Sequence, residues 1–169
     1  FAFMAQLIMV TGLSSDLYRA MERLFSGFPA GLVLATIGGG TGMAMVSGSS
    51  AASASTIGPM ALEEMIEQRG YGKTLSVGAI AASGGLASII PPTALAILYG
   101  YVAEVSVAAV FIAGIIPGFM MALLYVVVTL GWVALNPSVA PASPAQPLRQ
   151  RISGLSVLIP FLSLFSLVL

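Results

Sequence analysis

The sequence has 169 residues, of which 58% are hydrophobic and only 7% are charged. Its mean hydropathy of +1.03 is far above that of water-soluble domains, and a chain of this length can hold several membrane-spanning segments. Cysteine and histidine are absent, which excludes disulfides, thiolate metal sites and histidine-based proton transfer. These features predict an all-α, multi-pass membrane protein with no cofactor and no nucleic-acid partner.

The basic residues indicate which loops face the cytoplasm. The net charge is zero, and the six basic residues form three close pairs: Arg19 with Arg23, Arg69 with Lys73, and Arg149 with Arg151. Lysine and arginine concentrate in the cytoplasmic loops of membrane proteins. Each pair therefore predicts a cytoplasmic connection.

In chain order, apolar segments and their interruptions predict the following elements. They are the end of a spanning helix (1–13), an interfacial amphipathic helix (14–28), a re-entrant hairpin (29–69), a broken spanning helix (74–103), a spanning helix (107–133), a cytoplasmic loop (134–151) and the start of another spanning helix (152–169). Both ends of the chain look cut, because Phe1 and Leu169 lie within apolar runs. In the amphipathic helix we expect Ser15 or Asp16 to cap the first turn.

The hairpin is predicted from a polar interruption between two apolar segments. We expect Pro29 to begin its first helix, whose apolar stretch is only about seventeen residues long, a bare minimum for crossing the bilayer. In lipid, non-helical backbone persists only where protein or a water-filled cavity satisfies its polar groups. We therefore predict a tip that lines a binding site, formed by Ser47, Gly48, Ser49, Ser50 and Thr56.

Charge parity favours this re-entrant interpretation over a full crossing. If residues 30–69 crossed the membrane once, Arg69 and Lys73 would lie outside, against the distribution of positive charge in membrane proteins. A segment that enters, turns and leaves on the same side keeps both residues in the cytoplasm.

Two consecutive prolines predict the second interruption. Proline has no N–H, so Pro91 and Pro92 deprive the carbonyls of Ala87 and Ser88 of their helical partners. The residues expected at this break are Gly84, Gly85, Ser88, Pro91, Pro92 and Thr93. A simple proline kink packed by neighbouring helices is the structural alternative.

The two interruptions together predict binding chemistry. The hydroxyl groups of the tip and the carbonyls from Ala87 to Ile90 are uncharged oxygens, which suit a hard monovalent cation such as sodium. The helix that follows the tip presents its positive N-terminus, which favours an anion such as a carboxylate. Paired helix breaks of this kind are typical of secondary transporters.

The same residues allow other classes of membrane protein to be compared with a transporter. A serine protease would need a base, but the chain has no histidine and its only lysine, Lys73, lies in a predicted loop. An aspartyl protease would need two aspartates, and Asp16 is the only one. An ion channel, or a packing subunit without a substrate site of its own, remains the alternative to a transporter.

Three motifs resemble one known family. SGSSAASASTIG from Ser47, then EEMIEQRGYGKTLSVGAIAASGGLASIIPPTALAILYG, then EVSVAAVFIAGIIPG are similar, in order and spacing, to the large permease subunit of tripartite ATP-independent periplasmic (TRAP) transporters, the DctM-like family. The resemblance covers nearly all of residues 1–133 and implies that the chain corresponds roughly to the first of two inverted repeats.

The resemblance also implies a function. It implies an elevator-type transporter of the bacterial cytoplasmic (inner) membrane that is driven by sodium and takes small organic anions from a periplasmic binding protein, together with a small membrane subunit. The sodium ligands that it implies are Ser50 and Ser53, with the backbone of Ala87, Ile90 and Pro92. This chain has alanine at position 87, where glycine is common in the family. The substitution leaves the backbone carbonyl in place.

Overall fold

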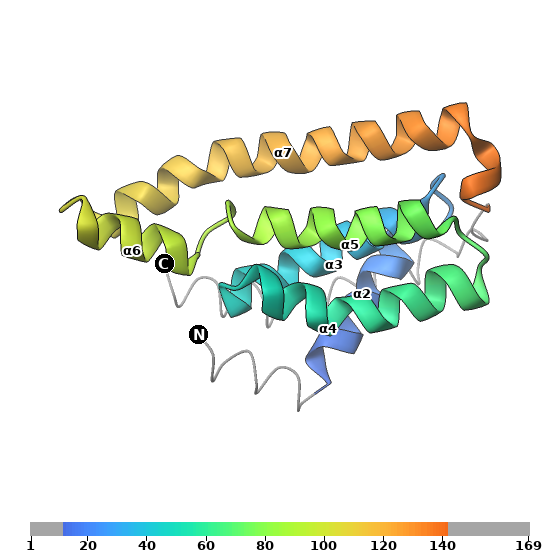
Figure 1. The fold of residues 1–169 in the computed structure, drawn as a ribbon, viewed down its shortest axis with the longest axis horizontal. Helices are drawn as coiled ribbons and strands as arrows, with labels where there is room; N and C mark the ends of the chain where they lie inside the picture. Colours follow the sequence, from blue (N-terminus) through green and yellow to red (C-terminus); the bar gives the residue numbers. More distant parts are fainter. Residues whose placement is uncertain (1–11, 142–169) are drawn as a thin grey trace.

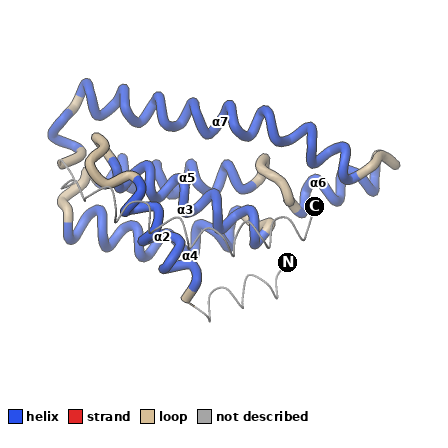
Figure 2. The backbone as a smooth tube through the Cα atoms, turned by 180° about the vertical axis from the view of Figure 1, so that it is seen from behind, coloured by secondary structure: helices blue, strands red, loops and turns tan. Residues whose placement is uncertain are grey.

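The computed structural model describes residues 12–141, which form a bundle of helices (Figures 1 and 2). No β-strand occurs within these residues, so the all-α prediction is confirmed for them. The predictions for residues 1–11 and 142–169, including the last spanning helix and part of the loop before it, lie outside the described residues.

The helices follow one another with short connections. They are α2 (Leu13–Leu24), α3 (Gly31–Ser47), α4 (Ser50–Leu62), the π-helix η1 (Glu63–Gln68), α5 (Lys73–Ala87), α6 (Ala94–Val102), α7 (Val107–Leu135) and the 3₁₀-helix η2 (Pro137–Val139).

Helix α2 is amphipathic as predicted, but neither Ser15 nor Asp16 caps it. Gly12 occupies the N-cap position in a left-handed conformation with φ of 74°, and no side chain caps the helix. Ser15 lies inside the first turn instead, where its hydroxyl donates to the Gly12 carbonyl at 2.7 Å. A hydroxyl that donates to a preceding carbonyl in this way accepts from no free N–H of the first turn, so Ser15 does not cap the helix.

Helices α3 and α4 form a helical hairpin. The predicted start at Pro29 is wrong by two residues, because Ala30 adopts a positive φ of 55° and α3 begins at Gly31. The turn falls where the polar run predicts it, at Gly48 with φ of 63° and at Ser49, the N-cap of α4. Glycine adopts positive φ without steric cost, which allows so tight a reversal.

Gly40 lies where α3 meets both α4 and α5. The hydroxyl of Ser53 in α4 donates to the Gly40 carbonyl at 2.5 Å, and both Ser53 and Ser83 of α5 are fully buried. A Cβ added at Gly40 would collide with the side chain of Ser83. Small residues let helices approach closely in lipid, where no hydrophobic force between helices replaces good packing.

The prolines break the next helix as predicted. Helix α5 ends at Ala87, residues 88–93 are not helical, and α6 begins at Ala94 after a cis Pro91–Pro92 peptide bond. A continuous, merely kinked helix is therefore ruled out.

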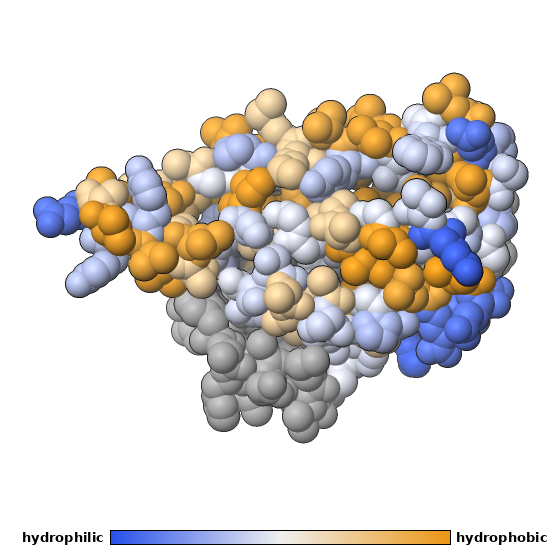
Figure 3. Space-filling view, in the orientation of Figure 1, coloured by the Kyte–Doolittle hydropathy of each residue, from blue (hydrophilic) through white to orange (hydrophobic). Residues whose placement is uncertain are grey.

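Helix α7 runs back along the whole bundle (Figure 1). Its 29 residues give a length of about 43 Å, more than the ~30 Å hydrocarbon core of a bilayer. It is the one helix of the described residues that is long and apolar enough to span a membrane, and only 11% of its most apolar window is buried within the bundle. Figure 3 shows strongly hydrophilic residues gathered at one end of the long axis and few at the other, with a mainly apolar or neutral face between them.

An ion-pair cluster fixes α2 to the base of the hairpin. Arg69 Nη2 lies 3.0 Å from Glu22 Oε1, and Arg69 Nε lies 3.3 Å from Glu64 Oε1. Glu64 and Arg69 are five residues apart, the spacing of hydrogen-bonded partners in a π-helix, and η1 contains Glu64. Burial, and then the neighbouring Glu64 carboxylate, raise the pKa of Glu22, while Arg69 lowers it.

We predict that Gly40→Ala destabilises the protein by roughly 1–3 kcal/mol, because the added methyl group overpacks the contact with Ser83. Gly78→Ala on α5 is the matched control, since its Cβ would meet nothing within 4 Å and alanine is the better helix former. Thermal unfolding in detergent measures both. Equal effects of the two substitutions would show that the close contact at Gly40 contributes nothing.

We predict unequal losses of stability for the two partners of the ion pair. Arg69→Gln leaves Glu22 and Glu64 facing each other and should cost roughly 1–3 kcal/mol, between the values for exposed and buried pairs. Glu22→Gln should cost little near neutral pH, because the fold already disfavours the ionised form of Glu22.

The pH dependence of protein stability provides a control for the Glu22 prediction. Because the pKa of Glu22 is raised in the fold, the folded state binds this proton more tightly than the unfolded chain does. The contribution of Glu22 to stability is therefore greatest below its unfolded pKa and is lost as pH rises through its folded pKa. Glu22→Gln should flatten that part of the stability curve, and an unchanged curve would contradict the assignment.

Candidate binding site where two helix breaks meet

The tip of the hairpin lies against the break between α5 and α6. The N–H of Ala94, the first residue of α6, donates to the carbonyl of Gly48 in the hairpin turn at 3.5 Å. One turn from the tip, a Cβ at Gly84 would stand 3.6 Å from the Ser50 carbonyl oxygen, so α5 and the start of α4 are also in contact. The two interruptions therefore lie in contact, as the sequence led us to expect.

Four helix ends converge at this site. Helices α3 and α5 end there, at Ser47 and Ala87, and present their carbonyl ends. Helices α4 and α6 begin there and present their N–H ends, so two partial negative and two partial positive charges lie together.

Both helices that begin at the site carry a conventional side-chain cap. Ser49 Oγ accepts from the Ala52 N–H at 3.4 Å, and Thr93 Oγ1 accepts from the Ala96 N–H at 3.1 Å. Each cap leaves other N–H groups of its first turn without a helical acceptor. These groups are the ones that helix N-termini use to bind anions.

Helix α7 covers the break through two glycines. A Cβ at Gly114 would stand 3.0 Å from the Ile89 carbonyl oxygen, and one at Gly118 would stand 2.7 Å from Ile90 Cγ1. About 10 Å of α7 precedes Gly114 and about 26 Å follows Gly118, at 1.5 Å per residue. The breaks therefore lie well inside the length of the spanning helix and not at its ends.

The residues predicted as sodium ligands lie on both sides of this contact. Ser53 is fully buried, and its hydroxyl donates its proton to the Gly40 carbonyl. A hydroxyl oxygen that donates its proton still has lone pairs with which to accept a cation. Ser50 is the first residue of α4 and is half-buried.

The remaining predicted ligands lie at the break. Ala87 is the last residue of α5, and Ile90 and Pro92 are buried within the non-helical segment. The helical partners of the Ala87 and Ser88 carbonyls would be residues 91 and 92, which are prolines and have no N–H. These carbonyls therefore have no helical N–H donor.

The other predicted tip residues separate into two groups. Ser47, Gly48 and Ser49 form the turn itself, and the Ser47 hydroxyl donates to the Ser49 carbonyl at 3.2 Å. Thr56 lies about 9 Å along α4 from its first residue, with its hydroxyl donating to the Ala52 carbonyl at 2.8 Å. The structure therefore does not bring Thr56 to the tip.

At the broken helix, most of the predicted residues cluster as expected. Pro91, Pro92 and Thr93 are buried, whereas Ser88, the C-cap of α5, is exposed. Gly85 faces α7, since a Cβ there would stand 3.4 Å from the Tyr125 hydroxyl oxygen.

Several residues of the site escaped prediction. Ala94 supplies the N–H that joins the breaks, Gly40 accepts from Ser53, and Ser83 packs against Gly40. The run of glycines around Gly40 was a signal of close packing, but the sequence does not reveal which helix meets it. Nothing in the sequence distinguishes Ala94 from its neighbours, because it contributes a backbone group.

The oxygen atoms gathered at the breaks are uncharged. Within residues 12–141, no three acidic, histidine or cysteine side chains are grouped so as to hold a metal ion. The ion-pair cluster of Glu22, Glu64 and Arg69 belongs to the base of the hairpin, at the other end of α4 from the tip.

These observations define an α-helical membrane protein in which two helix breaks meet. Comparison with known families identifies it further: residues 1–169 match the profile described as "Tripartite ATP-independent periplasmic transporter, DctM component". The chain belongs to this family of TRAP transporter large permease subunits.

Individual relatives agree with the family match. The chain is 37% identical over 112 residues to the isethionate TRAP transporter permease protein DctMQ of Oleidesulfovibrio alaskensis, which covers 66% of this chain and 18% of that protein. It is 31% identical over 124 residues to the C4-dicarboxylate TRAP transporter large permease protein DctM of Pseudomonas aeruginosa, covering 73% of this chain and 28% of that protein.

A third relative carries a different substrate in its name. The sialic acid TRAP transporter permease protein SiaT of Haemophilus influenzae is 29% identical over 148 residues, which covers 85% of this chain and 23% of that protein. The chain thus spans between 18% and 28% of the length of these three relatives.

Proposed function

We propose that this chain forms half of the binding site of a sodium-coupled secondary transporter that imports small organic anions, carboxylates among them. The contact between the Gly48 carbonyl and the Ala94 N–H carries the proposal, because it brings four helix ends to one point. Discontinuous helices use their N-termini for anionic substrate groups and their carbonyl ends for coupling cations.

In this proposal the two kinds of helix end have different roles. The carbonyl end of α5, from Ala87 to Ile90, and the hydroxyls of Ser50 and Ser53 hold the sodium ion. The first turns of α4 and α6, capped by Ser49 and Thr93, face the anionic group of the substrate. The basic residues of the described part lie elsewhere: Arg19 and Arg23 are in α2, Arg69 directly follows η1, and Lys73 is the first residue of α5. The helix ends and the bound sodium therefore provide the positive charge that faces the substrate.

The same arrangement supports a re-entrant hairpin. Figure 1 shows the α3–α4 tip level with the break between α5 and α6, while α6 and the first part of α7 extend beyond it. We propose that the hairpin enters and leaves from the cytoplasmic side of the bacterial inner membrane and moves with the site in an elevator-type cycle. The family implies a small membrane subunit and a periplasmic binding protein as partners.

The names of the relatives indicate only a broad class of substrate. Their names include isethionate, C4-dicarboxylates and sialic acid. A site made of backbone N–H groups and hydroxyls recognises an anionic group without fixing the rest of the molecule, which suits one scaffold to several such substrates.

We predict that substrate uptake requires a sodium gradient. The transporter that contains this chain, with its binding protein, is reconstituted in liposomes and assayed with sodium or with potassium at equal ionic strength. Ser50→Ala should raise the sodium concentration for half-maximal uptake about tenfold, which corresponds to ~1.4 kcal/mol for one lost ligand. Ser53→Ala should do the same and also lower stability, because the Gly40 carbonyl loses its donor.

Ser55→Ala is the matched control for both variants. Ser55 lies on the same helix, but it is exposed and its hydroxyl donates to the Ala52 carbonyl of its own helix at 3.0 Å. Uptake that is indifferent to sodium would refute the coupling. Saturable uptake with an equal sodium dependence in all three variants would refute the assignment of Ser50 and Ser53 alone, and ion currents without coupled substrate uptake would favour a channel.

A further inference from the structure

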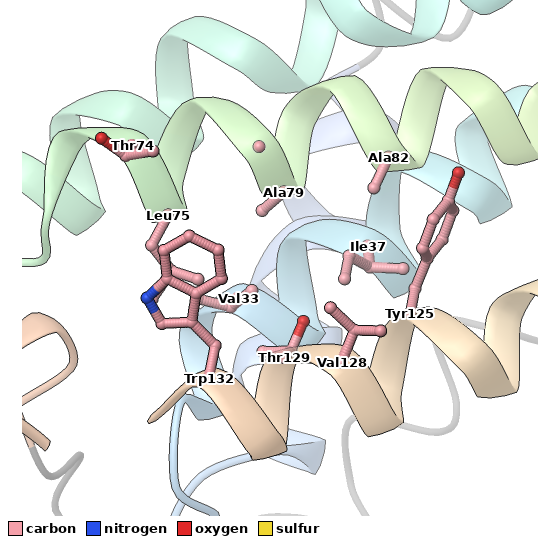
Figure 4. Close-up of a pocket in the computed structure, with 11 residues that line it drawn as sticks. Val33, Ile37, Thr74, Leu75, Ala79, Ala82, Tyr125, Val128, Thr129 and Trp132 are labelled. Carbon is pink, nitrogen blue, oxygen red and sulfur yellow. The ribbon is translucent and has the colours of Figure 1, made fainter. Parts of the chain in front are cut away.

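A cavity of about 310 Å³ lies between α3, α5 and α7, away from the helix breaks. Figure 4 shows its walls, to which α3 contributes Val33 and Ile37, α5 contributes Leu75 and Ala79, and α7 contributes Val128. Apolar side chains dominate this lining.

The cavity exists because α7 meets the rest of the bundle on either side of it. At one end Gly118 packs on Ile90, and at the other the Gly72 N–H, just before α5, donates to the Val139 carbonyl, just after α7, at 2.9 Å. Between these points α5 presents a small residue, Gly78, at which a Cβ would meet nothing within 4 Å. Neither helix therefore fills the space between them.

The shape and chemistry of the cavity restrict what can occupy it. Four side chains of the lining carry polar atoms, Thr74, Tyr125, Thr129 and Trp132, but apolar side chains dominate it, and an empty apolar cavity leaves its lining atoms without dispersion contacts. A linear hydrocarbon chain is thin, apolar and abundant in the surroundings of a membrane protein.

The Trp132 side chain marks one end of the cavity as the membrane interface. The Thr74 hydroxyl and the Trp132 indole nitrogen lie at one end and the Tyr125 hydroxyl at the other (Figure 4). Tryptophan favours the headgroup level of the bilayer. Lys73, which is exposed and directly precedes Thr74, adds a positive charge that attracts anionic lipids.

We propose that this cavity binds one acyl chain of an anionic phospholipid, whose headgroup lies at the Thr74 and Trp132 end beside Lys73. The lipid fills the space between α5 and α7 and braces α7 against the bundle. This proposal requires a membrane-embedded chain but does not depend on sodium coupling or on the substrate.

The test uses a phosphatidylglycerol that carries a photoactivatable diazirine in one acyl chain, present at low mole fraction in phosphatidylethanolamine vesicles with the complete transporter. After illumination, mass spectrometry locates the label. We expect labelling at buried cavity-lining residues such as Ala79 and Thr129, and competition by excess unlabelled phosphatidylglycerol. Gly78→Leu and Ala82→Leu, which fill the cavity, should each reduce that labelling severalfold.

Gly131→Leu is the matched control, because Gly131 lies on α7, is exposed, does not line the cavity and would have no neighbour within 4 Å of an added Cβ. Lys73→Gln should reduce labelling by phosphatidylglycerol more than labelling by the corresponding phosphatidylcholine. Label confined to outward-facing residues such as Ile116 and Leu124, without competition, would overturn the proposal. So would an unlabelled cavity in the unaltered protein, the result expected if another protein segment fills it.

Discussion

Backbone groups released by a helix break cannot turn to water inside the hydrocarbon core, so the protein itself must supply their partners. Here each break supplies part of what the other lacks: the Gly48 carbonyl of the hairpin turn accepts from the Ala94 N–H at the start of α6. The remaining architecture supports this contact. Gly40 lets α3 approach α4 and α5 closely, and α7 lies over the broken segment through Gly114 and Gly118. Small residues at these crossings, like the polar residues at the tip, thus support the contact between the two breaks.

The positions of the helices and breaks were largely predictable, because glycine, proline and serine act locally on the backbone. The turn at Gly48 and the break at Pro91 follow from φ preferences and from a missing N–H, whatever packs around them. The starts of α2 and α3 were predicted less well. They depend on Gly12 and Ala30, which adopt positive φ in their tertiary setting. The π-helical turn at Glu63–Gln68, which aligns Glu64 with Arg69, was not predicted at all.

The candidate site was predictable in its side chains more than in its backbone contacts. The serine-rich run and the two prolines indicated both halves of the site, and the charge pairs suggested that the first half turns back within the membrane. The sequence could not identify Ala94 or Gly40, because both contribute backbone groups that any residue possesses. It also placed Thr56 at the tip, whereas the helical rise carries this residue along α4. Helical periodicity fixes which residues share a face, but which faces meet is decided by the packing of the whole bundle.

The most direct test of this account is the proximity of the two breaks in the membrane. The chain contains no cysteine, so single cysteines at the exposed residues Ser49 and Ala94 provide unique attachment points within it. A short bifunctional thiol reagent should join Ser49→Cys to Ala94→Cys in liposomes, whereas Ser55→Cys, further along α4, should not react with Ala94→Cys. Failure of the first pair to cross-link, with both thiols shown to be reactive singly, would contradict the meeting of the helix breaks on which the proposed binding site depends.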